Sequence, residues 1–155
     1  MALQQQIDQQ LIRIPSGGKL VLANSEGTWE ADIARCDALG VAFNALVFST
    51  DRLANAETAL LSKIADKLVT QLRYLLEPLR VIEIDGQAGA VQMRSAPPYK
   101  QDQIRTYYEV LVQRGGNISL IRYEKQPGQA RTPIAAVVTR EVFYRLAEDL
   151  QNAVP

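Results

Sequence analysis

The chain has 155 residues, with 17 basic and 17 acidic side chains, no histidine and one cysteine. This length suits one domain with a substantial core. The absence of histidine excludes Ser-His-Asp and Cys-His catalytic devices, imidazole proton transfer near neutral pH and His-ligated metal centres. The balanced charge gives no overall field that would attract nucleic acid or an anionic membrane.

Sequence features that report on location favour the cytoplasm. No apolar run approaches the ~20 residues that a membrane-spanning helix needs. The segment 1–14 is rich in glutamine and lacks the basic and apolar regions of a signal peptide. Cys36 has no second cysteine with which to form a disulfide, which favours a reducing compartment. We therefore expect a cytoplasmic protein without a membrane partner.

The first half of the chain predicts a short helix, three strands and a long helix. Apolar residues recur at helical spacing from Leu3 to Ile14, and Pro15 ends the run. This N-terminal helix (1–15) is joined by a flexible Ser-Gly-Gly segment, so it either packs on its own sheet or exchanges onto a second copy. Strands are expected at 19–24, 28–36 and 41–49, and the long helix at 51–77, with Thr50, Asp51 or Asn55 as its cap.

The second half predicts a series of strands followed by a last helix. The strands are expected at 79–85, 88–94, 107–113 and 118–124, with one more short strand at 133–138. The segments 95–103 and 126–131 are expected to be loops. Thr139 is expected to cap the last helix, which buries Phe143, Leu146, Ala147 and Leu150.

Two hairpins have turns that allow a strand register to be predicted. A turn at Glu26-Gly27 would set Leu22 opposite Ala31 and Leu20 opposite Ile33. A two-residue turn at Gly115-Gly116 would pair Val110 with Ile121, Tyr108 with Tyr123, and Glu109 with Arg122.

These elements predict a single α+β domain over residues 1–155. Its antiparallel sheet of about seven strands, in the order α-βββ-α-ββββ(β)-α, would be covered on one face by the long central helix and the C-terminal helix. Through Pro78 this order resembles that of class I type III secretion chaperones. A sheet wrapped around a long helix also resembles a helix-grip fold or half of a TATA-binding protein. No motif accompanies either resemblance, so no family is identified.

Most residues with possible chemistry have a structural explanation. Cys36 lacks a histidine base and is interpreted as an idle or buried thiol. Two pairs of carboxylates alternate along strands and are interpreted as solvated strand faces: Glu30 with Asp32, and Glu83 with Asp85. The two glycine pairs, Gly17-Gly18 and Gly115-Gly116, do not precede a helix, so neither is interpreted as a phosphate-binding loop. We predict no catalytic residue, metal site or cofactor. Trp29 is expected on the covered face or at its edge, while an exposed Trp29 would indicate a partner site.

The strongest binding candidate is the stretch 94–108. The segment 94–131 has seven basic and three acidic side chains (net +4), whereas 1–50 has three and five (net −2). Arginine and tyrosine are typical of interface hot spots and suit an acidic or aromatic ligand. The alternative is that Tyr107 or Tyr108 belongs to the core and the charges only solvate the loop. The candidate residues are Arg94, Tyr99, Lys100, Arg105 and Tyr107.

Three functional hypotheses remain. The first is a non-catalytic protein-interaction domain, chaperone-like or adaptor-like. It would bind a protein partner or associate with itself as a homodimer, and it would bind no nucleic acid. The second is a small-molecule module with a pocket between the long helix and the sheet and polar groups such as Arg94 or Arg122. The third is an enzyme that uses only carboxylates, lysine or tyrosine.

Overall fold

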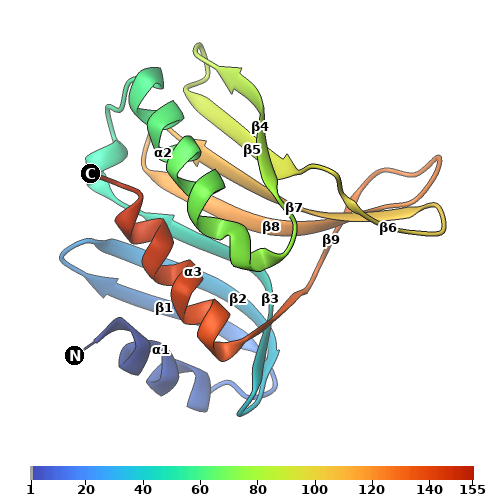
Figure 1. Cartoon of the computed structure of the whole chain (residues 1–155). Coiled ribbons are helices and arrows are strands. Elements are labelled where there is room, and N and C mark those ends of the chain that lie inside the picture. The colour runs from blue at the N-terminus through green and yellow to red at the C-terminus, as the bar shows by residue number, and fades with distance from the viewer. Residues whose placement is uncertain (1) are drawn as a thin grey trace.

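Residues 2–155 are described by a computed structural model, in which three α-helices accompany one antiparallel sheet (Figure 1). The helices are α1 (Leu3–Ile12), α2 (Thr58–Gln71) and α3 (Arg140–Asn152). The strands are β1 (Gly18–Asn24), β2 (Gly27–Cys36), β3 (Gly40–Ser49), β4 (Leu79–Asp85), β5 (Ala90–Ser95), β6 (Tyr99–Gln101), β7 (Ile104–Gln113), β8 (Asn117–Lys125), β9 (Thr132–Ile134) and β10 (Ala136–Thr139). The predicted α+β class with an antiparallel sheet is therefore confirmed.

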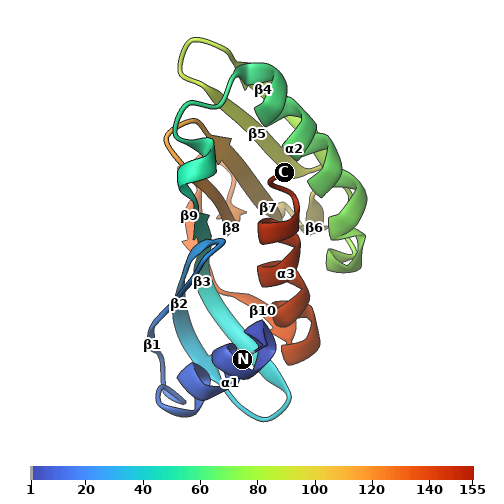
Figure 2. The same ribbon diagram turned by 90° about the vertical axis from the view of Figure 1, so that its left-hand side faces the viewer.

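Seven of the ten strands form the main order β1-β2-β3-β8-β7-β5-β4. The three short strands β6, β9 and β10 pair with β7, β8 and β3. Helix α2 contacts β4, β5 and β7, while α3 contacts β3 and β10. Figure 2 shows α2 and α3 on the same side of the sheet. We call the sheet face toward these helices the inner face and the opposite one the outer face.

Apolar side chains fill the space between α2 and the inner face. Leu61, Ile64 and Leu68 of α2 are 0–2% exposed, and so are the strand residues Val91 and Val110. Burial of this kind is the main source of stability for an amphipathic helix. Between residues 2 and 155, no helix is both long and apolar enough to cross a membrane.

Helix α1 packs on the core of its own chain. Ile7 and Leu11 are each 1% exposed. The Asp8 carboxylate accepts a 3.1 Å hydrogen bond from Arg140 at the start of α3, and a second from the Tyr144 hydroxyl. By packing on its own chain, α1 therefore buries its apolar stripe and provides hydrogen-bond donors for its one acidic side chain.

The helix predicted over 51–77 is present but shorter, because this segment forms three pieces, of which α2 is the α-helix. The Thr50 side chain accepts from the Arg52 N–H and caps a 3₁₀ turn, Asp51–Leu53, so this predicted cap serves a shorter element. After α2 the chain continues as a second 3₁₀ turn, Leu72–Leu75, which ends at Leu76 in the left-handed conformation (φ 64°). A left-handed residue ends helical geometry, so the helical segment stops at Leu76 and not at Pro78.

Two further segments differ from expectation. The segment 95–103, predicted as loop, contains β6, which pairs with β7 through a two-residue turn. Asp102 occupies the left-handed region there (φ 56°), which aspartate tolerates better than most residues. The single strand expected at 133–138 is two strands, because β9 pairs with β8 and β10 pairs with β3.

Both predicted hairpin registers are wrong. Leu22 lies opposite Trp29, because the first turn is Ser25-Glu26 and Gly27 already pairs with Asn24. The Asn24 side chain accepts from the backbone N–H groups of Glu26 and Gly27, which fixes this tight turn. A β-carbon on Gly27 would collide with the Ser49 carbonyl oxygen.

The second hairpin is shifted by one residue. Its turn has three residues, with Gly115 and Gly116 both at positive φ (99° and 125°), so Val110 pairs with Leu120. A shift of one residue exchanges the faces of a strand. Arg122 therefore lies opposite Tyr108 on the inner face, and Glu109 lies opposite Ile121 on the outer face.

Candidate functional site

The outer face carries a buried carboxylate between two arginines. Glu109 on β7 is 9% exposed and lies directly opposite Arg94 of β5, with Oε2 3.5 Å from the guanidinium. Arg131, from the segment between β8 and β9, donates to both Glu109 oxygens. These bonds hold the pKa of Arg131 above its ordinary value. The carboxylate thus fixes two cations that come from distant parts of the chain.

Two tyrosines extend this cluster along the outer face. Tyr107 and Tyr123 are directly paired across β7 and β8, with ring centroids 6.0 Å apart. The Arg94 guanidinium lies 4.6 Å from the Tyr107 ring centroid, and that of Arg131 lies 3.9 Å from the Tyr123 centroid. Cations at these distances are attracted to the negative face of the ring. The arginines are therefore held in fixed positions while they remain about one-third exposed.

A pocket of about 450 Å³ opens beside Tyr107. Its lining combines four cations with one aromatic ring, one hydroxyl and two small apolar residues: Arg94, Arg105, Lys125, Arg131, Tyr107, Ser95, Ala96 and Pro98. Ser95 shapes the wall, since its hydroxyl accepts from the Tyr108 N–H at 2.9 Å just beyond the last β5–β7 pair. Because the β5–β7 hydrogen-bond ladder ends here, the backbone after Ser95 can turn away from β7 and leave space for the pocket.

Three cations stand in a row across neighbouring strands at one end of this pocket. Arg105 on β7 lies directly opposite Lys125 on β8 and directly opposite Lys100 on β6. We call Lys100, Arg105 and Lys125 the cation row. Lys100 lies in β6 and Lys125 is the last residue of β8, and Figure 1 shows the connections that follow these strands, β6–β7 and β8–β9, projecting at the right. Like charges placed directly opposite each other in a sheet are destabilising.

Within residues 2–155, no carboxylate forms an ion pair with the cation row. The Lys125 ammonium donates to the backbone carbonyls of Gln126 and Gln129, which leaves its charge uncompensated. Arg105 also lines a second hollow of about 530 Å³ together with Lys100, Gln103 and Pro127. The two hollows meet at Arg105 and make one basic surface.

The structure brings together most of the residues predicted from the sequence. Arg94, Arg105 and Tyr107 line the same pocket, and Lys100 is in the row beside it. Tyr99 points to the other face, because it pairs with Thr106, whose hydroxyl accepts from Arg122 on the inner side.

Sequence reasoning missed Glu109, Lys125 and Arg131 as members of the site. The signal that could have found them is the charge excess of the segment 94–131, which contains all three. The predicted Glu109–Arg122 pair assigns the carboxylate to the wrong arginine, so it does not connect Glu109 with Arg94 and Arg131. Arg122 instead pairs with Glu77 at 2.8 Å on the inner face and stacks on Tyr108 at 4.4 Å. Arg94 and Arg122 are therefore on opposite sides of the sheet.

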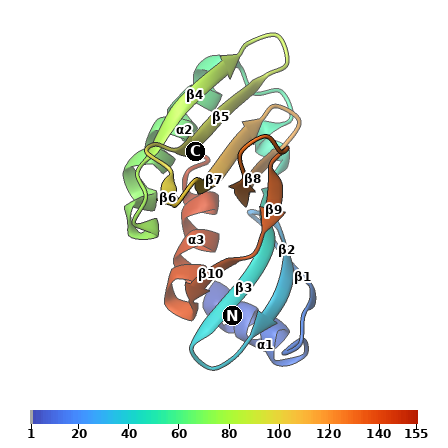
Figure 3. The same cartoon turned by 90° about the vertical axis from the view of Figure 1, so that its right-hand side faces the viewer.

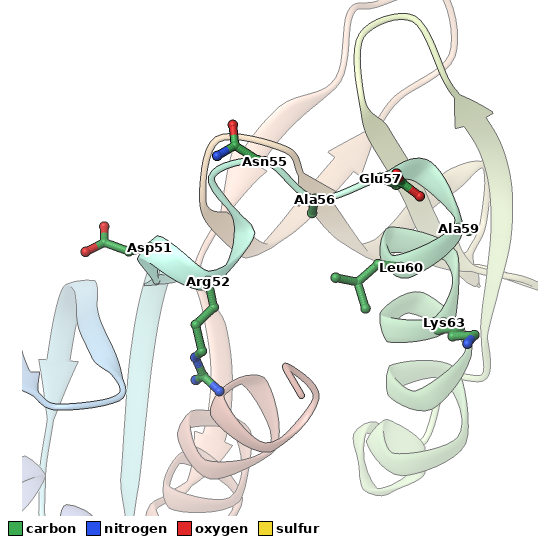
Figure 4. Close-up of a pocket in the computed structure, with 8 residues that line it drawn as sticks. All are labelled: Asp51, Arg52, Asn55, Ala56, Glu57, Ala59, Leu60 and Lys63. Carbon is green, nitrogen blue, oxygen red and sulfur yellow. The ribbon is translucent and has the colours of Figure 1, made fainter.

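A larger pocket, of about 520 Å³, lies where the Asp51–Leu53 turn meets α2 (Figure 4). Its one arginine, Arg52, points toward the end of α3. It donates to the carbonyls of Val154 and Pro155 and pairs with Glu26 at 3.1 Å. Because its charge is already used to join three parts of the chain, this pocket is the weaker candidate.

The remaining candidates have structural roles. Trp29 is 1% exposed, so it is no partner site. The Cys36 thiol lies 3.6 Å from the Leu11 carbonyl oxygen, at the join between α1 and the sheet. Glu30 pairs with Lys19, and Asp32 accepts from Asn44. The part of the chain that the structure describes contains no group of three or more acidic or cysteine side chains that could hold a metal ion.

Figure 3 shows the strands β5, β7 and β8 that carry the site, and α3 beyond them. Comparison with known proteins gives no match to this chain among family models, curated protein sequences or solved structures.

Proposed function

We propose that this protein is a non-catalytic interaction domain that binds an acidic segment of a partner protein on the outer face of its sheet. The observation that carries the proposal is the pocket beside Tyr107, where four cations converge and, within residues 2–155, Glu109 is the one carboxylate that forms ion pairs with them. Arg94 and Arg131 are held in place by that carboxylate and by the tyrosine rings. Preorganised cations of this kind lose little conformational entropy when a ligand binds.

The composition of the pocket suits a peptide with both acidic and apolar side chains. Arginine presents a planar fork that matches a carboxylate, and Pro98, together with the small exposed part of Tyr107 (7%), offers apolar contact. Tyrosine and arginine are also the residues most enriched at protein-interface hot spots. A pocket of about 450 Å³ accommodates one or two side chains of such a segment.

The alternative hypothesis of a pocket between α2 and the sheet has less support, because apolar side chains fill that layer. A small acidic molecule is the second candidate occupant of the outer pocket, which has a volume typical of ligand sites. The two occupants are distinguished by the size of ligand that gives full affinity.

The proposal is tested by fluorescence anisotropy with a short labelled peptide that contains glutamates and one leucine. We expect binding that weakens as salt is added, because the contacts are between charges near the surface. Arg94→Gln should weaken it about tenfold, as expected for the loss of one charge-assisted contact. Arg73→Gln, which removes the same charge from the helix layer, should have no effect. Equal loss in both variants would show that only net charge matters and would overturn the proposal.

A second copy of the chain is the other candidate partner. At the opposite end of the outer face, β2 carries two carboxylates, Glu30 and Asp32, of which Glu30 pairs with Lys19. An acidic end that meets the basic pocket of a neighbour would give head-to-tail contacts. Sedimentation analysis at several protein concentrations tests this: a monomer throughout excludes it, and concentration-dependent association that Glu30→Lys abolishes supports it.

A further inference from the structure

We infer that the cation row of Lys100, Arg105 and Lys125 binds a phosphate group, carried on a phosphorylated side chain of the partner segment. This inference rests on the proposed function, since it assigns a chemical class to the ligand of the same basic surface. It starts from three cations in adjacent positions, with which no carboxylate of residues 2–155 forms an ion pair.

The spacing of the row suits an anion with several acceptor oxygens. Neighbouring strands lie about 4.8 Å apart, so side chains from β6, β7 and β8 in one row can converge on a single group. Lys100, Arg105 and Lys125 emerge from directly paired positions of those strands. A phosphate monoester offers three acceptor oxygens and about two negative charges at neutral pH, whereas a carboxylate offers two oxygens and one charge.

The same surface shows what a single carboxylate can do. Glu109 occupies the fork between Arg94 and Arg131, and it compensates those two cations only in part. A carboxylate placed on the row would leave two of its three charges uncompensated. A dianionic group comes closer to balance and can accept from Arg105 and both lysines at once.

The row is also positioned to be reached by a bound peptide. Arg105 lines both the pocket beside Tyr107 and the neighbouring hollow that includes Lys100. A segment whose apolar side chain contacts Tyr107 and Pro98 can therefore place the next side chains on the row. Lys100 and Arg105 are exposed and Lys125 is partly exposed, so solvent and a ligand can reach the row.

The experiment compares three forms of one labelled peptide at fixed ionic strength: with serine, with glutamate and with phosphoserine at the same position. We expect the phosphoserine form to bind at least about tenfold more tightly than the glutamate form, because it adds charge and a further acceptor. Arg105→Gln should remove this advantage. It should also weaken binding of the glutamate form, but by a smaller factor. Arg73→Gln is the matched control and should change neither.

The outcomes separate this inference from the proposed function. If the glutamate and phosphoserine forms bind equally, and Arg94→Gln weakens both, the interaction domain stands and the phosphate site is overturned. If no form binds, the proposed function fails as well. Inorganic phosphate and a single-stranded oligonucleotide are used as competitors in the same assay. If free phosphate in the millimolar range displaces the peptide, and the phosphoserine form binds no more tightly than free phosphate, the site is assigned to free phosphate and the phosphopeptide is overturned. Tighter, Arg105-dependent binding of the oligonucleotide would overturn the phosphopeptide.

The pH dependence gives a second readout that a general effect of charge would not produce. The chain contains no histidine, so no side chain of its own with an unperturbed pKa titrates between pH 5 and 8. The second ionisation of phosphoserine has a pKa of about 6. Affinity for the phosphoserine form should therefore rise between pH 5 and 7, while affinity for the glutamate form stays flat. A flat profile for both forms would contradict binding of the dianion.

Discussion

The indole N–H of Trp29 donates a 2.9 Å hydrogen bond to the backbone carbonyl of Ala147 in α3. The Trp29 ring lies on the inner face, 4.8 Å from the Phe48 ring centroid, so one side chain links β2, β3 and α3. A buried indole that satisfies its only donor in this way is a structural residue.

We expect Trp29→Phe to lower the free energy of unfolding by roughly 1–3 kcal/mol, because it removes a buried hydrogen bond and leaves a small cavity. Urea unfolding followed by circular dichroism checks this, since the variant lacks the tryptophan fluorophore. Tyr99→Phe changes an aromatic side chain that is 55% exposed and should stay within about 0.5 kcal/mol of the wild type. Equal stability of the wild type and Trp29→Phe would contradict the proposed link.

Arg105→Gln should affect stability and binding in opposite directions. Removal of the central cation relieves repulsion from Lys100 and Lys125, which lie directly opposite it. We expect a gain of about 0.5 kcal/mol or less in the free energy of unfolding, because these side chains reach solvent. The gain should shrink at high salt, when the charges are screened. A loss of stability in this variant would show that Arg105 has a structural role instead.

Glu109→Gln should destabilise the fold and strengthen binding of the acidic peptide. Arg94 and Arg131 lose the carboxylate that holds them, which we expect to cost about 1–3 kcal/mol of unfolding free energy. The pocket then has one negative charge fewer, so the acidic peptide should bind roughly fivefold more tightly, as for ~1 kcal/mol between charges in a water-like medium. Glu124→Gln makes the same charge change on the inner face and is the control. Weaker peptide binding by Glu109→Gln would show that the carboxylate mainly orients the arginines.

Tyr74→Phe should change how stability depends on pH in the alkaline range. Burial, together with a 2.6 Å hydrogen bond to Asp149, raises the pKa of the Tyr74 hydroxyl above its usual value. Above pH ~10 the unfolded chain loses this proton while the folded chain keeps it, so the unfolded state binds fewer protons and stability falls as pH rises. The contribution is complete below pH ~10 and is lost by at most about 1.4 kcal/mol per pH unit above it.

The measurement for Tyr74 is urea unfolding from pH 8 upward for both proteins. The variant should lose about 1 kcal/mol at pH 8, where the hydrogen bond is missing. The difference between the two proteins should then narrow above pH ~10, because only the wild type has this titrating group. Burial also raises the pKa of Tyr108, which both proteins retain, so some alkaline loss should remain in the variant. Parallel curves would contradict the role of Tyr74.

Much of the fold could be predicted because its signals are local. Apolar spacing predicts α1 and α3, the Thr139 cap marks the start of α3, and the predicted strand 79–85 has the bounds of β4. The two hairpin registers depend on local and distant contacts together. The first turn has a local signal in the Asn24 side chain, but Gly27 also approaches the Ser49 carbonyl on a third strand. In the second turn, the Gly116 carbonyl accepts from the Thr50 N–H, which lies outside the hairpin.

The sequence by itself determined the class of the protein, an α+β domain without histidine chemistry, and the basic segment 94–131 that contains the proposed binding surface. Only the tertiary structure decided which charges meet. A shift of one residue between β7 and β8 sends Arg122 to the inner face with Glu77 and aligns Arg105 with Lys125 on the outer face. Side chains alternate with a period of two, so the pairing of the strands, and not the order of the residues, determines which cations share one surface.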